Sequence, residues 1–122
     1  MTAKVLVVDD SQAVREMIGE ALREAGYEVV EAEDGVQGLS KLDSETDISI
    51  VLCDVNMPHM DGLEMLTAVK AAKRNAALPV FMLTTEGKVD VIRQAKHLGA
   101  RGWIIKPFKR DQLVALVRKI VG

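Results

Sequence analysis

Short runs of apolar and β-branched residues recur along the chain, separated by longer stretches of mixed polarity. Three of these runs, VLVV, ISIVLC and PVFML, are almost entirely apolar instead of alternating with polar residues. Such runs are typical of strands that are covered on both faces, as in a parallel sheet. The runs together predict five strands, at Lys4–Val8, Glu28–Ala32, Ile48–Cys53, Pro79–Leu83 and Gly102–Ile105.

Between these runs, apolar residues recur three and four positions apart, the spacing of one face of an α-helix. Val14, Ile18 and Leu22 show this period in the first gap, where Ser11 is placed to cap the helix and Gly26 to end it. The same period leads the other helices, at Val36 and Leu39, at Leu63, Leu66 and Val69, at Val89, Ile92 and Ala95, and at Leu113, Leu116, Val117 and Ile120. Five strand–helix units in succession predict an α/β fold, with helices on both faces of a parallel sheet.

Composition narrows the class of protein. The 122 residues are enough for one domain with a substantial core, and a net charge of −2 does not suggest nucleic-acid binding. The sequence contains no apolar run near the ~18 residues that a membrane span needs and no signal-peptide core. The single cysteine, Cys53, fits a reducing compartment. We therefore expect one cytoplasmic domain over residues 1–122, without an output domain, nucleic-acid binding or membrane insertion.

Chemically active side chains follow four of the five predicted strands. Asp9 and Asp10 follow the first strand, Asp54 the third, Thr84 the fourth and Lys106 the fifth. In an open parallel sheet these ends share one edge, where ligands bind. Any one of these residues alone is more often a helix cap, a turn residue or a solvated charge. Their convergence on one edge instead predicts a site.

The second strand is followed by Glu33 and Asp34, which we interpret as a solvated loop and a helix cap. If this strand lies at the edge of the sheet, the lack of a reactive group at its end is expected.

The three carboxylates repel one another, so their clustering calls for a compensating cation. Hard oxygen donors without a Cys or His cluster favour Mg²⁺, with Mn²⁺ as a substitute, over zinc. Such a Mg²⁺ site retains waters that a phosphoryl group can displace. We therefore interpret Asp9, Asp10 and Asp54 as a metal site for phosphoryl chemistry.

A phosphoryl group at this site would give each remaining residue a role. An ionised aspartate can attack phosphorus directly and form an aspartyl phosphate. Lys106 would offset charge on the phosphoryl oxygens, and Thr84 would donate a hydrogen bond to one of them. Geometry favours Asp54 as the nucleophile, because its strand is flanked by the acidic pair on one side and by Thr84 and Lys106 on the other.

The motifs VLVVDDS, VLCDVNMPHMDGLEML, LTTEG and WIIKPF, in this order and spacing, resemble the receiver domains of two-component response regulators. The resemblance covers essentially the whole chain and is greatest to the stand-alone chemotaxis regulators. It implies a flavodoxin-like, doubly wound, five-stranded sheet of strand order 2-1-3-4-5 with five helices in three layers. It also implies that Asp54 is the phosphoacceptor, and that Thr84 and Lys106 contact the phosphoryl group.

The resemblance further implies a ligand set for the metal. Asp10 and Asp54 would bind Mg²⁺ directly, the main-chain carbonyl of Asn56 would be a third ligand, and Asp9 would act mainly through water. The family also has a cis peptide bond where this chain has Lys106-Pro107.

Signal output in the family involves an aromatic residue on the fifth strand that shifts inward after phosphorylation. Trp103 occupies this position and is the expected switch, with a role as a surface anchor as the alternative. The loop from Thr85 to Lys88 would respond to Thr84. Within the site, Asn56 and Glu86 would contact the hydrolytic water. On the last helix, Val114 and Val121 lie off the apolar stripe, a modest indication of a partner surface.

The leading hypothesis is thus a stand-alone response regulator rather than an enzyme with an external substrate. It would take a phosphoryl group from a histidine kinase, lose it by autodephosphorylation, and bind a downstream protein such as a flagellar motor switch. The alternatives are a phosphorelay intermediate or an excised receiver domain. A phosphatase with an Asp nucleophile is disfavoured, because such enzymes commonly carry a second Asp at the position of Asn56. A flavin-binding protein of the same fold is disfavoured, because Asp9 and Asp10 would repel the phosphate of the flavin.

Overall fold

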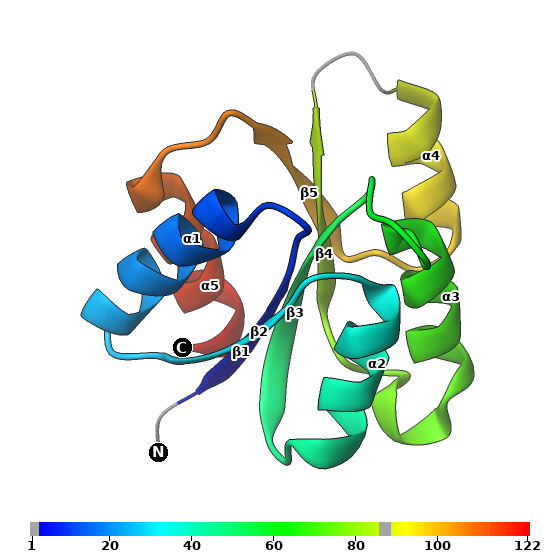
Figure 1. Cartoon of the computed structure of the whole chain (residues 1–122), viewed down its shortest axis with the longest axis horizontal. Coiled ribbons are helices and arrows are strands. Elements are labelled where there is room, and N and C mark those ends of the chain that lie inside the picture. The colour runs from blue at the N-terminus through cyan, green and yellow to red at the C-terminus, as the bar shows by residue number, and fades with distance from the viewer. Residues whose placement is uncertain (1–2, 86–88) are drawn as a thin grey trace.

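The computed structural model describes residues 3–85 and 89–122, except for the side chain of Arg74. Its five parallel strands form one sheet in the order β2-β1-β3-β4-β5, which confirms the expected topology (Figure 1). The strands are β1 (Lys4–Val8), β2 (Glu28–Ala32), β3 (Ile48–Asp54), β4 (Val80–Thr85) and β5 (Gly102–Lys106). Their bounds differ from the predicted ones by two residues at most.

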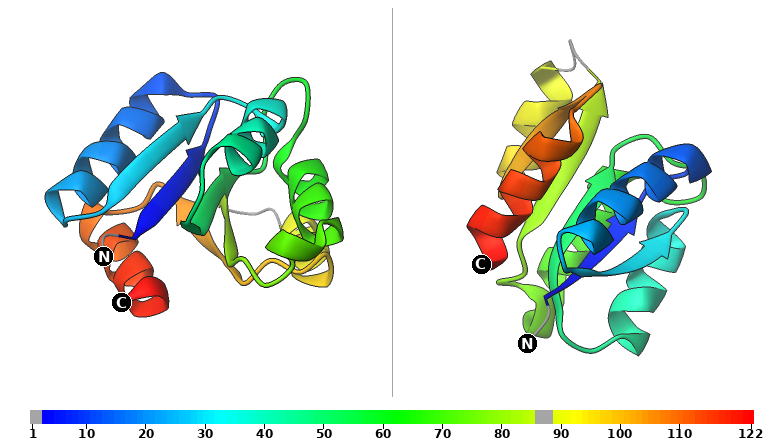
Figure 2. Two further views of the ribbon diagram at one scale, coloured as in Figure 1. Left: turned by 90° about the horizontal axis from the view of Figure 1, so that it is seen from below. Right: turned by 90° about the vertical axis from the view of Figure 1, so that its left-hand side faces the viewer.

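Helices follow the strands in strict alternation and cover both faces of the sheet. They are α1 (Gln12–Glu24), α2 (Gly35–Ser44), α3 (Gly62–Ala71), α4 (Val89–His97) and α5 (Arg110–Val121). Helices α1 and α5 lie on one face, and α2, α3 and α4 lie on the other, so the three-layer architecture is confirmed (Figure 2). A short 3₁₀ helix, η1 (Lys73–Asn75), was not expected from the pattern. Within the described residues, no helix is long and apolar enough to cross a membrane.

The apolar strand runs reflect a core on each side of the sheet. In β1, Val5 and Val7 pack toward α1 and α5, while Leu6 and Val8 pack toward α2 and α3. Successive residues of a strand point to opposite faces, so a strand buried on both faces has no polar positions to alternate. Cys53 is buried in the second of these cores.

In two helices the first predicted apolar residue lies outside the face that packs on the sheet. Val36 and Val89 are exposed, because each lies in the first turn of its helix at the open edge. Ala95 of α4 is buried as predicted, and Val91 and, just after the helix, Leu98 pack against the same core.

The last helix also differs from one expectation. Val114 and Val121 are partly buried and pack against the core formed with α1, so they do not form the separate partner surface that their position suggested. Leu113 and Val117 are fully buried, as predicted.

Helix caps agree with the sequence. The Ser11 side chain accepts a hydrogen bond from the Val14 amide at the start of α1, and Gly26 follows the helix with a φ of 98°. The predicted cap Asp34 accepts a hydrogen bond from the Gln37 amide at the start of α2. These caps set the directions in which the helices leave the strand ends.

Candidate functional site

The candidate site lies at the carboxyl ends of β1, β3 and β5. Val8 pairs with Cys53 in the sheet, so Asp9 and Asp54 leave two neighbouring strands side by side. Lys106 is the last residue of β5, two strands beyond β3. The strand order therefore brings together an acid from each of two central strands and a cation from the edge.

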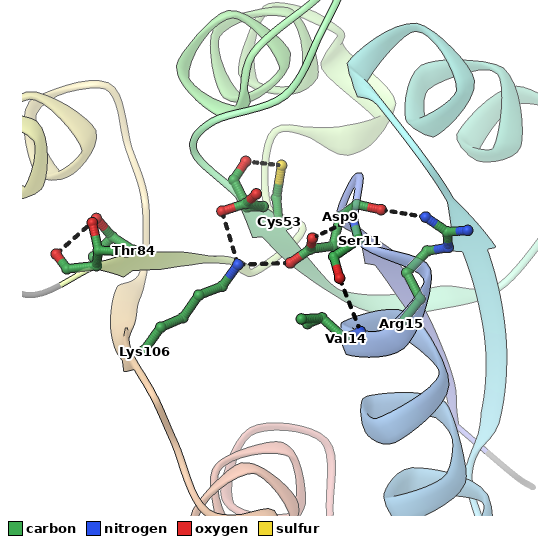
Figure 3. A network of polar contacts seen from close by, with 9 residues as sticks. Asp9, Ser11, Val14, Arg15, Cys53, Thr84 and Lys106 are labelled. Atoms are coloured by element: carbon green, nitrogen blue, oxygen red, sulfur yellow. Dashed lines mark hydrogen bonds and ion pairs between the residues drawn. The ribbon is translucent and has the colours of Figure 1, made fainter.

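Lys106 links the two acids directly. Its Nζ lies 2.9 Å from Oδ2 of Asp9 and 3.2 Å from Oδ1 of Asp54 (Figure 3). The Asp9 side chain is fully buried, and that of Asp54 is 9% exposed. The ammonium therefore offsets two carboxylates that have little access to solvent.

Asp9 is held by hydrogen bonds at each of its polar groups. Its main-chain amide donates to the carbonyl of Ala32, and its carbonyl accepts from Nη1 of Arg15. Its Oδ1 accepts from the Ser11 amide at 2.9 Å, and Oδ2 accepts from Lys106. Its carboxylate is therefore fixed in place.

Asp10 completes the acidic cluster. One carboxylate oxygen from each of Asp9, Asp10 and Asp54 lies within 4.8 Å of the others. Asp10 is exposed, whereas the other two are buried. All the donors are hard oxygens, and the cluster opens to solvent at Asp10. This donor set fits Mg²⁺ or Mn²⁺, which retain water ligands, better than it fits zinc.

Burial and charge shift the protonation of the site. Loss of solvent, followed by the charge of Asp9, raises the pKa of Asp54 to about 6, while Lys106 partly opposes this shift. For Lys106, loss of solvent lowers the pKa, but its hydrogen bond to Asp9 and the charges of Asp54 and Asp9 outweigh that effect and leave it raised. The lysine is therefore a cation at neutral pH.

Asn56 borders the same opening. It lines a surface hollow together with Asp10, Met57, Pro58 and Asp61. This loop is anchored at its far end, where Asp61 and Glu64 form a reciprocal capping box at the start of α3. The structure thus places Asn56 beside Asp10 of the acidic cluster.

Thr84 and Trp103 lie outside the network around Lys106. Thr84 is buried in β4, and its hydroxyl donates to the carbonyl of Thr85 at 3.4 Å. Trp103 lies in the edge strand β5 and is 39% exposed. The Lys106-Pro107 bond is cis, as expected. The loop residue Glu86 lies outside the described residues.

Two contacts at the site were not predicted. Arg15 reaches the Asp9 carbonyl from α1, and His59 places Nδ1 2.9 Å from Oδ2 of Asp34. The His59 side chain is 73% exposed. His59 and Asp34 are 25 residues apart in the chain, and Arg15 lies off the apolar stripe of α1. The only sequence signals are the placement of Asp34 as a cap and of Arg15 in the first turns of α1.

Comparison with known families agrees with this architecture. The family model of the response regulator receiver domain matches residues 5–118, so the chain belongs to this family. Receiver domains are signalling phosphoacceptors rather than conventional enzymes. They receive phosphoryl groups from histidine kinases, bind Mg²⁺ in an acidic pocket and act on downstream targets. The cluster of Asp9, Asp10 and Asp54 has the donors to hold such an ion.

The chain is similar to several individual members of the family, chemotaxis proteins among them. The chain is 41% identical over 121 residues to chemotaxis protein CheY1 of Helicobacter pylori strain J99, covering 98% of this chain and 97% of the relative. Among solved structures, CheY4 of Vibrio cholerae, a chemotaxis protein, matches with a TM-score of 0.93 and 38% identity, covering 99% and 100% of the two chains. The receiver domain of NtrX from Brucella abortus matches with a TM-score of 0.87 and 29% identity, covering 96% and 97%.

Proposed function

We propose that this chain is a stand-alone response regulator that accepts a phosphoryl group on Asp54 and thereby changes its binding to a downstream protein. The observation that carries the proposal is the contact of Lys106 with both Asp9 and Asp54 beside a cluster of three carboxylates. A buried aspartate between a lysine and a cluster of metal-type donors is arranged to take up phosphoryl charge.

In the proposed reaction, a carboxylate oxygen of Asp54 forms a bond to phosphorus as the bond from phosphorus to the donor's leaving group breaks. The leaving group is an imidazole nitrogen of a phosphohistidine on the kinase, and it keeps the electron pair of the broken bond. The product is an acyl phosphate. Asp54 needs no general base, because it is mostly ionised at neutral pH with a pKa of about 6.

The other residues hold the phosphoryl group and the metal. Asp10, Asp54 and the Asn56 carbonyl would hold Mg²⁺, with Asp9 acting through water because its own oxygens are already bonded. When bound, Mg²⁺ neutralises charge on phosphoryl oxygens. Lys106 would turn from Asp54 toward a phosphoryl oxygen. The weak hydrogen bond of Thr84 to Thr85 is readily exchanged for one to the same group.

For the downstream step, the exposed edge strand is the proposed output. Trp103 and Ile105 are large apolar side chains exposed on the edge strand β5. A change at Thr84 and the following loop would alter the packing of Trp103. The chemotaxis names of the relatives favour a partner in chemotaxis, within the cytoplasm.

The test is chemical phosphorylation followed by intact mass measurement. The protein is incubated with acetyl phosphate in Mg²⁺ or in EDTA, beside Asp54→Asn and the control Asp111→Asn, which removes an exposed acid on α5. A single phosphoryl adduct should form in wild type and in the control, should require Mg²⁺, and should be missing from Asp54→Asn. An adduct that survives EDTA or Asp54→Asn would contradict the proposal.

A further inference from the structure

Arg15 connects the edge strand β2 to the turn that carries the acidic pair. Its Nη1 donates to the Asp9 carbonyl at 2.6 Å, and its Nε lies 3.4 Å from Oε1 of Glu31 on β2. The Arg15 side chain is only 14% exposed. In Figure 3 it approaches Asp9 from the side opposite Lys106. The largely buried guanidinium therefore bridges β2 and the β1–α1 turn.

The hydrogen bond from Arg15 holds the peptide group that joins Asp9 to Asp10. A peptide group is planar, so fixing the Asp9 carbonyl oxygen also fixes the direction in which the chain enters Asp10. The Asp9 amide is held by Ala32, and its carboxylate by Ser11 and Lys106. Asp10 is exposed, and the peptide that precedes it is the one whose carbonyl Arg15 holds.

We infer that Arg15 is a positioning residue for metal binding: it aims the Asp10 carboxylate into the acidic cluster by holding the Asp9 carbonyl. This inference rests on the proposed function, because it assigns a second layer of support to the proposed Mg²⁺ ligands. Residues that orient ligands in this way contribute strongly to metal affinity without touching the ion.

Because Arg15 is charged, the direction of the change in Mg²⁺ affinity tests the inference. A guanidinium near a cation site opposes cation binding, so if only charge mattered, neutralising Arg15 would tighten Mg²⁺ binding. If Arg15 positions Asp10, the same substitution weakens Mg²⁺ binding. The two effects run in opposite directions, and a single affinity measurement separates them.

Arg23 provides a matched control on the same helix. Its Nη2 lies 3.2 Å from Oε2 of Glu31, the acid that also pairs with Arg15, and its side chain is 52% exposed. Arg23→Gln and Arg15→Gln give proteins of equal net charge, and each removes one partner of Glu31. Only Arg15 also bonds the Asp9 carbonyl.

The experiment is calorimetric titration of Mg²⁺ into wild type, Arg15→Gln, Arg15→Lys and Arg23→Gln, each shown by circular dichroism to be folded at the working temperature. We expect Arg15→Gln to bind Mg²⁺ about tenfold more weakly, and Arg23→Gln to stay within about twofold of wild type. Arg15→Lys keeps the charge but loses the planar fork, so it should also bind more weakly, by about threefold or more. It also serves as the readout if Arg15→Gln does not fold.

Phosphorylation by acetyl phosphate gives a second readout. In Arg15→Gln the half-saturating Mg²⁺ concentration should rise by the same factor as the dissociation constant, while the rate at saturating Mg²⁺ stays within about twofold of wild type. An Arg15→Gln or Arg15→Lys dissociation constant equal to or tighter than that of wild type overturns the inference, as does an equal loss in Arg23→Gln. Those outcomes leave Mg²⁺ binding by wild type intact, whereas a wild type that binds no Mg²⁺ removes the proposed function itself.

Discussion

Lys106 and Asp54 form an ion pair of 3.2 Å between Nζ and Oδ1, although 52 residues separate them in the chain. Asp54 is thereby held between this ammonium and the neighbouring carboxylate of Asp9. Burial, and after it the charge of Asp9, raises the pKa of Asp54. The resting pocket is thus balanced between attraction and repulsion. The consequences of that balance can be measured on the protein itself.

Replacing Lys106 should destabilise the fold and make its stability depend on Mg²⁺. In Lys106→Met, the buried carboxylates of Asp9 and Asp54 lose their compensating cation, so the free energy of unfolding in EDTA should fall by about 2 kcal/mol. Adding Mg²⁺ should raise the urea midpoint of Lys106→Met by more than that of wild type. Lys109→Met, which removes an exposed lysine three residues away, should leave both quantities nearly unchanged. Equal Mg²⁺ effects in all three proteins would count against this account.

The raised pKa of Asp54 predicts a pH-dependent stability. Because the folded-state pKa is about 6, above the ordinary 3.8, the folded protein holds the proton more tightly than the unfolded chain. The contribution of Asp54 to stability is therefore fully present below pH 3.8 and is lost as the pH rises through 6. Asp54→Asn is neutral throughout, so in EDTA its stability relative to wild type should increase by about 2–3 kcal/mol between pH 4 and pH 7. Urea unfolding at several pH values measures this difference, and a difference that does not vary with pH would exclude the raised pKa.

Asp34 should stabilise the start of α2 in two ways. Its carboxylate accepts from the Gln37 amide and contacts His59, and the hydrogen bond from Gln37 is the main reason that its pKa is lowered. The stabilisation is present above pH 3.8 and is lost as the pH falls through the lowered value. At neutral pH, Asp34→Ala should lose about 1–2 kcal/mol of unfolding free energy. Asp34→Asn should lose less, because asparagine also caps helices, and thermal melts that rank the two variants equally would argue against the cap.

Gly62 should tolerate no side chain. A Cβ there would meet the main-chain carbonyl oxygen of Asp54 and lie 2.8 Å from the Cα of Val55, and neither backbone group can move away without displacing the end of β3. Gly62→Ala should therefore lose about 3 kcal/mol of stability. Gly38→Ala is the comparison, since its Cβ would lie 2.7 Å from the end of the flexible Met65 side chain and should cost far less. Chemical unfolding of both variants tests the ranking.

Much of the fold could be predicted from the sequence because a strand buried on both faces needs an unbroken apolar run, and helices between such strands need an apolar stripe. Those two rules located all five strands, and the preference of Ser and Asp for the N-cap position located the caps at Ser11 and Asp34. The strand order came from the resemblance instead, since periodicity does not state which strands are neighbours. The same rules misjudged Val36 and Val89, because an apolar residue in the first turn of a helix can lie beyond the edge of the surface that the helix covers.

The convergence of Asp9, Asp54 and Lys106 followed from the rule that parallel strands end at one edge. The supporting contacts did not. Whether Arg15 reaches a carbonyl, or His59 reaches Asp34, depends on side-chain paths between elements that sequence spacing does not define. The hydrogen bond from the Thr84 hydroxyl to the Thr85 carbonyl, within the same strand, is likewise a detail that a sequence motif does not specify.

The contact between Asp9 and Lys106 spans 97 residues, nearly the whole chain. The pocket therefore cannot exist while the protein is still being synthesised, until residue 106 has emerged and β5 has joined the sheet. A chain that stops before β5 lacks the cation that offsets the buried acids Asp9 and Asp54. The assembled pocket is for that reason also a report that β5 has been made and has docked beside β4.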